Sequence, residues 1–151
     1  IRSEVSLVFN GLHELGYRGA YGTKREGLDL RSGRQIDLFE PNDLYAAFYR
    51  RRFSAGGQAR LWAGATGMGE GVIGADASIP LGGSWALENS FIYVIPKEGL
   101  AGNGQREESW SIGIQLVWYP GRSSRCVFRN PHQPLFNVAD NTFFLMRRPN
   151  D

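Results

Sequence analysis

The sequence predicts an all-β protein, an antiparallel up-and-down meander of about seven strands that forms an outer-membrane-type β-barrel or part of one. Apolar and polar residues alternate with period two from residue 3 to residue 119, and no window of about a dozen residues sustains the 3.6-residue period of a helix. Turn signals rich in Gly, Asn and Pro divide this stretch. The 20 glycines among 151 residues, with 13% aromatic residues, suit closely packed barrel walls.

The first two strands are predicted on either side of Asn10-Gly11, a strong two-residue hairpin signal. The run before it, 3–9, places Val5, Leu7 and Phe9 on one face, and the run after it, 12–24, alternates in the same way. Because Phe9 and Leu15 are in phase, a single strand over 3–24 is the alternative.

Five further strands follow. Residues 25–43 are polar and predict a long loop, after which we expect strands over 44–54 and 58–66 joined by a tight turn at 55–57. The next strands are expected over 71–79, 84–95 and 108–119, with turns at 67–70 and 80–83 and a second long loop at 96–107. Residues 1–121 thus form the predicted barrel meander, and residues 122–151 form an irregular C-terminal extension.

Composition excludes several classes of protein. The 17 basic and 15 acidic residues leave a net charge of +2, too small for the basic surface of a nucleic-acid-binding protein, so nucleic acid is not an expected partner. Cys126 is the single cysteine, so an intrachain disulfide is impossible. No run approaches the roughly 18 apolar residues of a membrane helix, but barrel strands alternate and need no such run.

Aromatic residues at the strand ends favour a membrane barrel. Trp110 and Trp118 lie eight residues apart on the apolar face of the last strand. At roughly 3.3 Å per residue and a tilt of about 40°, they are separated by about 20 Å along the barrel axis, close to the height of an apolar membrane band. The same spacing recurs in two other strands, and the predicted aromatic girdle is Tyr45, Phe53, Trp85, Tyr93, Trp110 and Trp118.

The connections also sort by length. Those at 25–43, 67–70 and 96–107 share one end of the sheet, whereas 10–11, 55–57 and 80–83 share the other. Long loops opposite short turns are typical of outer-membrane barrels, whose short turns are periplasmic. Seven strands is an odd number, whereas single-chain bacterial barrels mostly have an even number of at least eight, so we expect further strands upstream of Ile1.

The mixed faces of the strands, rich in Gly, Ala and Ser, are predicted to line the barrel lumen. Folding the hairpins about their turns places Arg52 opposite Arg60 and Asp76 close to Glu88, and such like-charged pairs need counter-charges across the lumen. Arg51 falls on the apolar face, where it can snorkel to the interface. The predicted lumen charge network is Glu14, Arg18, Arg50, Arg52, Arg60, Asp76 and Glu88.

No arrangement of residues indicates catalysis. The nucleophile motif GxSxG does not occur, and His13 and His132 have no partners at metal-ligand spacing. We therefore expect no enzymatic activity, no metal site and no cofactor.

Several segments resemble uncharacterised outer-membrane β-barrel-like envelope proteins of planctomycete-type bacteria. The similarity covers about half of the chain and lies in Arg60-Leu61-Trp62, Gly74-Ala75-Asp76, Pro80-Leu81-Gly82, 85–89, 107–110, 118–121 and 134–141. It implies an envelope protein with no catalytic residues to carry over.

These observations favour a bacterial outer-membrane protein, a passive pore or a structural envelope component. Its expected partners are the lipid bilayer and, if the lumen is open, small polar solutes. The oligomeric state does not follow from the sequence. The alternative is a soluble β-barrel or sandwich that binds a small apolar ligand or a protein, in which the apolar face would point inward.

Overall fold

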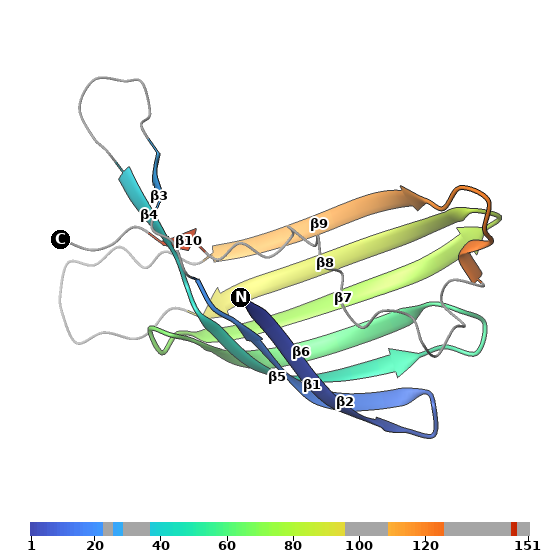
Figure 1. Ribbon diagram of the computed structural model, residues 1–151, viewed down its shortest axis with the longest axis horizontal. Helices are drawn as coiled ribbons and strands as arrows, with labels where there is room; N and C mark the ends of the chain where they lie inside the picture. Colours follow the sequence, from blue (N-terminus) through green and yellow to red (C-terminus); the bar gives the residue numbers. More distant parts are fainter. Residues whose placement is uncertain (23–25, 29–36, 96–108, 126–145, 148–151) are drawn as a thin grey trace.

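The computed structural model describes residues 1–22, 26–28, 37–95, 109–125 and 146–147. Its main element is one seven-stranded antiparallel sheet in which sequence neighbours pair, in the order β1-β2-β5-β6-β7-β8-β9 (Figure 1). The strands are β1 (Arg2–Phe9), β2 (His13–Ala20), β5 (Leu44–Arg52), β6 (Gln58–Thr66), β7 (Gly71–Gly82), β8 (Trp85–Ile95) and β9 (Ser109–Trp118). The predicted all-β antiparallel meander is confirmed.

A second, three-stranded sheet lies outside this meander. It consists of β3 (Glu26–Leu28), β4 (Asp37–Pro41) and β10 (Met146–Arg147), in the order β10-β4-β3. The prediction of a plain loop over 25–43 was therefore wrong, because β3 and β4 pair as an antiparallel hairpin within it. Two residues of the predicted C-terminal extension pair with β4, while its stretches 126–145 and 148–151, and the predicted loop 96–107, lie outside the described residues.

The short turns follow the local chemistry of the chain. Asn10 and Gly11 both have positive φ, at 50° and 67°, so the predicted hairpin forms and the single long strand over 3–24 does not. The turn between β7 and β8 lies later than predicted. An irregularity between Pro80 and Gly82 lets β7 continue past Pro80, because a bulge tolerates a residue that has no N–H to donate.

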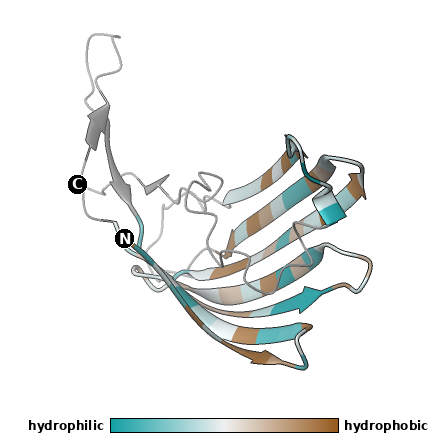
Figure 2. Cartoon of the chain, turned by 45° about the vertical axis from the view of Figure 1, so that its right-hand side comes forward, coloured by the Kyte–Doolittle hydropathy of each residue, from teal (hydrophilic) through white to brown (hydrophobic). Residues whose placement is uncertain are grey.

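The seven strands have two chemically different faces. On the inner face, residues are mostly buried or half-buried; on the outer face, large apolar residues remain exposed. The alternation is visible along each strand in Figure 2. Inner residues are even-numbered in β1, β2 and β5–β8 and odd-numbered in β9, a change of phase that the β8–β9 register requires, since Phe91 pairs with Ile112.

Large inner side chains lie over glycines on neighbouring strands. Gly16 pairs with Phe48, Phe48 with Trp62, and Trp62 with Gly74. A Cβ atom on Gly74 would overlap the Trp62 indole, and one on Gly16 would overlap the Phe48 ring. Each of these two aromatic side chains thus fits the inner face because one of its two cross-strand partners is a glycine. They belong to a buried apolar cluster of Leu44, Ala46, Phe48, Trp62, Val72, Ile92 and Val94.

The sheet is curved but open, as Figures 1 and 2 show, and β1 and β9 are its two edges. Successive antiparallel strands alternate in direction, so these two edge strands both run toward the end that carries the short turns. Among the described residues, no helix is long and apolar enough to cross a membrane.

Candidate functional site: an ionic network on the inner face

The network centres on Arg50, which is buried at the short-turn end of β5. Its Nη1 donates to both carboxylate oxygens of Glu14, each at 2.9 Å, and its Nη2 donates to Oε1 of Glu4 at 2.7 Å. Glu14 pairs with Arg50 across β2 and β5, so this charge-assisted contact follows directly from the strand register. The Ser6 hydroxyl donates to Glu14 Oε1 at 2.7 Å.

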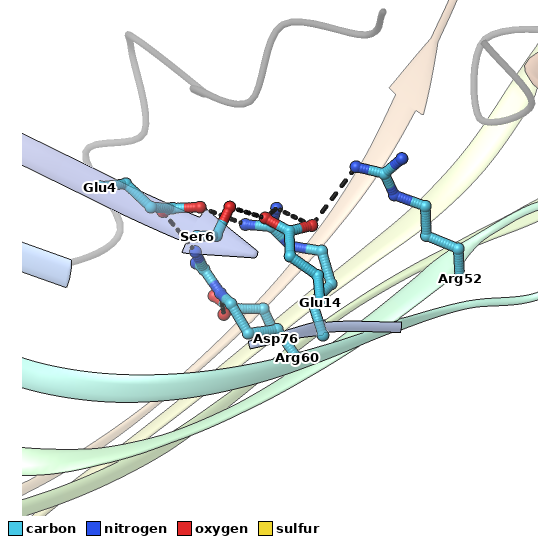
Figure 3. A network of polar contacts seen from close by, with 7 residues as sticks. Glu4, Ser6, Glu14, Arg52, Arg60 and Asp76 are labelled. Carbon is cyan, nitrogen blue, oxygen red and sulfur yellow. Dashed lines mark hydrogen bonds and ion pairs between the residues drawn. The ribbon is translucent and has the colours of Figure 1, made fainter. Parts of the chain in front are cut away.

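Arg60 and Arg52 extend the network in opposite directions. Arg60 donates through Nε to Oδ2 of Asp76, its cross-strand partner on β7, at 2.6 Å, and through Nη1 to Oε2 of Glu4 at 3.1 Å. Arg52 donates through Nη2 to Glu14 Oε2 at 3.3 Å. Each carboxylate therefore receives a guanidinium, and the Glu4 carboxylate bridges two of them (Figure 3).

The network spans five strands. Glu4 lies on β1 and Arg60 on β6, with β2 and β5 between them in the sheet. At about 4.8 Å per strand, three spacings separate them by about 14 Å along the sheet. The curved sheet of Figure 1 shortens this separation on the inner side, where Glu4 and Arg60 form a direct ion pair at 3.1 Å. The network accordingly braces the curvature of the meander.

The burial of these groups makes their pairing matter. Glu14 is 1% exposed and Arg50 is 5% exposed, so neither retains appreciable contact with water. A buried ion pair adds little net stability over an apolar pair, but removing one partner leaves a desolvated charge and costs about 3–5 kcal/mol. The guanidinium carbons of Arg50 and Arg60 also lie 5.1 and 5.7 Å from the Phe48 ring centroid, within cation–π distance.

The structure brings together five of the predicted lumen residues, Glu14, Arg50, Arg52, Arg60 and Asp76. The other two lie elsewhere on the inner face. Arg18 is buried with its guanidinium 5.5 Å from the Trp62 ring centroid. Glu88 accepts a hydrogen bond from the Tyr119 hydroxyl at 3.3 Å.

The expected cross-strand pairs were off by two residues. Arg60 pairs with Arg50, and Arg52 faces Gln58, because the β5–β6 turn is centred on Ala55, one residue earlier than predicted. Its Phe53 and Gly57 are joined by a hydrogen bond from the Phe53 amide. For the same kind of reason, the shifted β7–β8 turn places Asp76 opposite Ser90 and Ser78 opposite Glu88.

Sequence reasoning missed two members of the network, Glu4 and Ser6. Both alternate with Val5 and Leu7, so period two alone assigns them to the inner face. Glu4 changes the charge balance. With it, the network holds three arginines, Arg50, Arg52 and Arg60, against three carboxylates, Glu4, Glu14 and Asp76, and is neutral overall.

The predicted girdle residues all lie on the outer side of the sheet, near strand ends. Trp85 and Trp118 pair across β8 and β9 at the short-turn end, with ring centroids 6.3 Å apart. Tyr93 pairs with Trp110 at the opposite end. Tyr45 packs edge-on against Tyr21, and Phe53 follows β5 at the short-turn end. Trp110 is 66% exposed and Trp118 58%, so the outer face leaves large indole surfaces open.

No catalytic arrangement is found in the parts of the chain that the structure describes. Those residues contain no group of three or more His, Cys, Asp or Glu side chains that could hold a metal ion. His13 lies apart from the inner network and bonds through Nδ1 to the Tyr49 hydroxyl at 2.6 Å, while His132 and Cys126 lie outside the described residues. The network contains cations and carboxylates that already neutralise one another.

Fold and site together define a class: an antiparallel β-meander with an apolar outer face and an ionic inner face. The chain belongs to a family of unknown function, DUF6666, which matches residues 1–146. No curated protein and no solved structure matches the chain. The resemblance to planctomycete-type envelope proteins therefore stays a prediction.

Proposed function

We propose that this chain is the strand meander of a bacterial outer-membrane β-barrel, and that it acts as a structural component of the envelope and not as an enzyme. The outer face would contact lipid, and the inner face would be cross-braced by the Glu4–Arg50–Glu14 network. The short turns would face the periplasm.

The observation that carries the proposal is the near absence of charge on the outer face. Among the outward positions of the seven main strands, Arg51 is the one Asp, Glu, Lys or Arg residue. Water-exposed protein surfaces usually carry many charges of both signs. Exposed apolar residues instead run across all seven strands, β1, β2 and β5–β9, and soluble monomers rarely expose extended apolar patches. Representative members are Val5, Leu15, Tyr49, Leu61, Ile73, Ile79, Phe91, Ile112, Ile114 and Leu116.

The inner network favours a structural role over an open pore. Its three guanidinium groups and three carboxylates pair at 2.6–3.3 Å and leave no excess charge to attract an ion of either sign. We therefore expect no preference for anions over cations from these residues. The ion pair between Glu4 on β1 and Arg60 on β6 also holds these two strands close together and leaves less space between them.

Tryptophan quenching tests the membrane assignment. The chain has four tryptophans, of which Trp110 is exposed on the outer face and Trp62 is buried on the inner face. Two variants that keep only Trp110 or only Trp62, with phenylalanine at the other three positions, would be reconstituted into vesicles containing lipids brominated on their acyl chains. We expect strong quenching of Trp110 and weak quenching of Trp62. Equal quenching, or recovery of the folded protein without detergent or lipid, would contradict the proposal and support the soluble alternative.

Conductance separates the structural role from a pore. Arg60 bridges Glu4 and Asp76, so Arg60→Glu would reverse a charge at the middle of the network. In planar bilayers we expect no unitary conductance from the unmodified protein. A steady conductance whose reversal potential in a salt gradient shifts with Arg60→Glu would instead establish a pore lined by these residues.

A further inference from the structure

Arg51 occupies an unusual position on the outer face. It is exposed one residue before the end of β5, next to the short turn that joins β5 to β6. Its strand neighbours Arg50 and Arg52 point inward and join the ionic network, whereas none of the described carboxylates forms an ion pair with Arg51. A guanidinium on an apolar surface thus lacks an anion from the described part of its own chain.

A second hydrogen-bonding group lies beside it. His13 on β2 is the direct cross-strand partner of Arg51, so their Cβ atoms lie about 5 Å apart on the same face. The His13 Nδ1 atom lies 2.6 Å from the Tyr49 hydroxyl. In the tautomer in which the Tyr49 hydroxyl donates to Nδ1, the ring proton is on Nε2, the nitrogen that Tyr49 does not engage.

Aromatic rings surround these two donors. Arg51 lies over the Phe53 ring with its guanidinium carbon 5.8 Å from the centroid, and the His13 and Tyr49 rings stack at 6.0 Å. Phe9 is the other cross-strand partner of His13 and is 50% exposed. In membrane barrels, aromatic residues at the strand ends lie at the depth of the lipid headgroups. The two donors, which lie among aromatic rings at a strand end, would lie at the same depth.

We propose that Arg51 and His13 bind the phosphate of an anionic phospholipid in the leaflet next to the short turns. This inference rests on the proposed membrane location. The planar guanidinium can donate two parallel hydrogen bonds to phosphate oxygens, and the His13 Nε2–H can donate a third. The acyl chains of the same lipid would lie against exposed Leu15 and Leu61.

Charge and surroundings select a phospholipid over other anions. The outward strand positions contain no carboxylate near Arg51, so the positive charge is uncompensated by the surface around it. A free phosphate ion or an acidic peptide would satisfy the charge but would leave the surrounding apolar rings exposed to water. A lipid phosphate satisfies both requirements because its apolar chains are attached to the anion.

Native mass spectrometry of the reconstituted protein tests the proposal. The protein is folded in vesicles of equal phosphatidylglycerol and phosphatidylcholine, transferred to mild detergent, and its retained lipids are counted. We expect preferential retention of phosphatidylglycerol and a roughly fivefold loss of that preference in Arg51→Gln, as expected for one interfacial cation. Arg51→Lys should keep part of the preference, since it keeps the charge but loses the planar fork.

Arg52→Gln is the matched control, because it removes the same charge from the next residue of the same strand but on the inner face. It should leave the phosphatidylglycerol preference unchanged. A preference that survives Arg51→Gln, or that falls equally in both variants, would overturn this inference alone. If the unmodified protein retains neither lipid and shows no heat-sensitive gel shift of a membrane barrel, both this inference and the proposed function fail.

Discussion

The two faces of the meander place arginine in opposite settings. On β5, Arg50 is 5% exposed and bonded to two carboxylates, whereas its neighbour Arg51 points outward among aromatic rings. Inside, charges pair with charges; outside, one cation stands on an apolar surface. The total charge of the chain therefore says little about its environment. What identifies the environment is how period two distributes that charge between faces.

The same comparison indicates which substitutions of charged or apolar residues should lower the stability of the protein. The inner face depends on pairs that must both be present, because its charges are removed from water. If the outer face contacts lipid as proposed, a bilayer would penalise any charge added to it according to depth. The same substitution at two neighbouring residues can therefore lower the free energy of unfolding at one position and leave it nearly unchanged at the other.

The largest effect is expected at the centre of the network. Glu14→Gln removes the carboxylate that accepts from Arg50, Arg52 and Ser6, and should lower the free energy of unfolding by about 3–5 kcal/mol. Reversible urea unfolding in lipid vesicles would measure it. Glu88→Gln, which alters a half-buried carboxylate bonded to Tyr119, should cost clearly less. Equal losses of unfolding free energy in the two variants would show that the ionic network contributes no more to stability than the Glu88–Tyr119 hydrogen bond.

The next effect contrasts two adjacent residues of β9. Ile114 is 71% exposed on the outer face at mid-strand, and Gln115 points to the inner face. Ile114→Arg should destabilise the protein in lipid by about 2–4 kcal/mol, as arginine does near a bilayer midplane, while Gln115→Arg should be tolerated. Similar losses for both variants in the same unfolding experiment would mean that lipid does not distinguish the faces.

A smaller effect is expected where an aromatic ring lies over glycine. Gly74→Ala would force the Trp62 indole away from β7, and we expect a loss of about 1–3 kcal/mol from overpacking. Trp62→Leu in the Gly74→Ala background should recover part of that loss, because the smaller side chain leaves room for the methyl group. If the double variant is as unstable as the sum of the single ones, the two residues are not coupled.

The smallest effect concerns pH at the end of β9. Burial raises the pKa of the Tyr119 hydroxyl above its usual value near 10, and the charge of Glu88 and their hydrogen bond raise it further. The stability that this shift contributes is fully present below about pH 10 and is lost as the pH rises through the folded pKa. Unfolding between about pH 9 and pH 11 should therefore show a steeper decline for the unmodified protein than for Tyr119→Phe. If stability declined with pH equally in the two proteins, the raised pKa of Tyr119 would be contradicted.

Much of the fold followed from alternation and turn chemistry. The Asn10-Gly11 turn and the strand order required only local signals, because neighbouring strands of a meander pair in sequence order. The register did not follow, since one residue of error in a turn displaces every pair by two, as it did for Arg52 and Arg60. The short strands β3 and β4 also escaped prediction, because three and five residues are too few to establish a period.

The network was only partly predictable for a different reason. Alternation assigns Glu4 and Arg60 to the same face, but their contact depends on how tightly the sheet curls between β1 and β6. Curvature is a property of the whole sheet and depends on strands that are far apart in the sequence. The curvature of the sheet therefore cannot be predicted from any short segment of the sequence.

The shared direction of β1 and β9 constrains how this sheet can be completed. Joined directly, the two edges would make a parallel pair, and a second copy in the same membrane orientation would offer β9 a parallel β1 as well. Any all-antiparallel closure must therefore insert an odd number of strands between β9 and β1. A barrel closed in this way would have an even number of strands, whatever supplied the added ones.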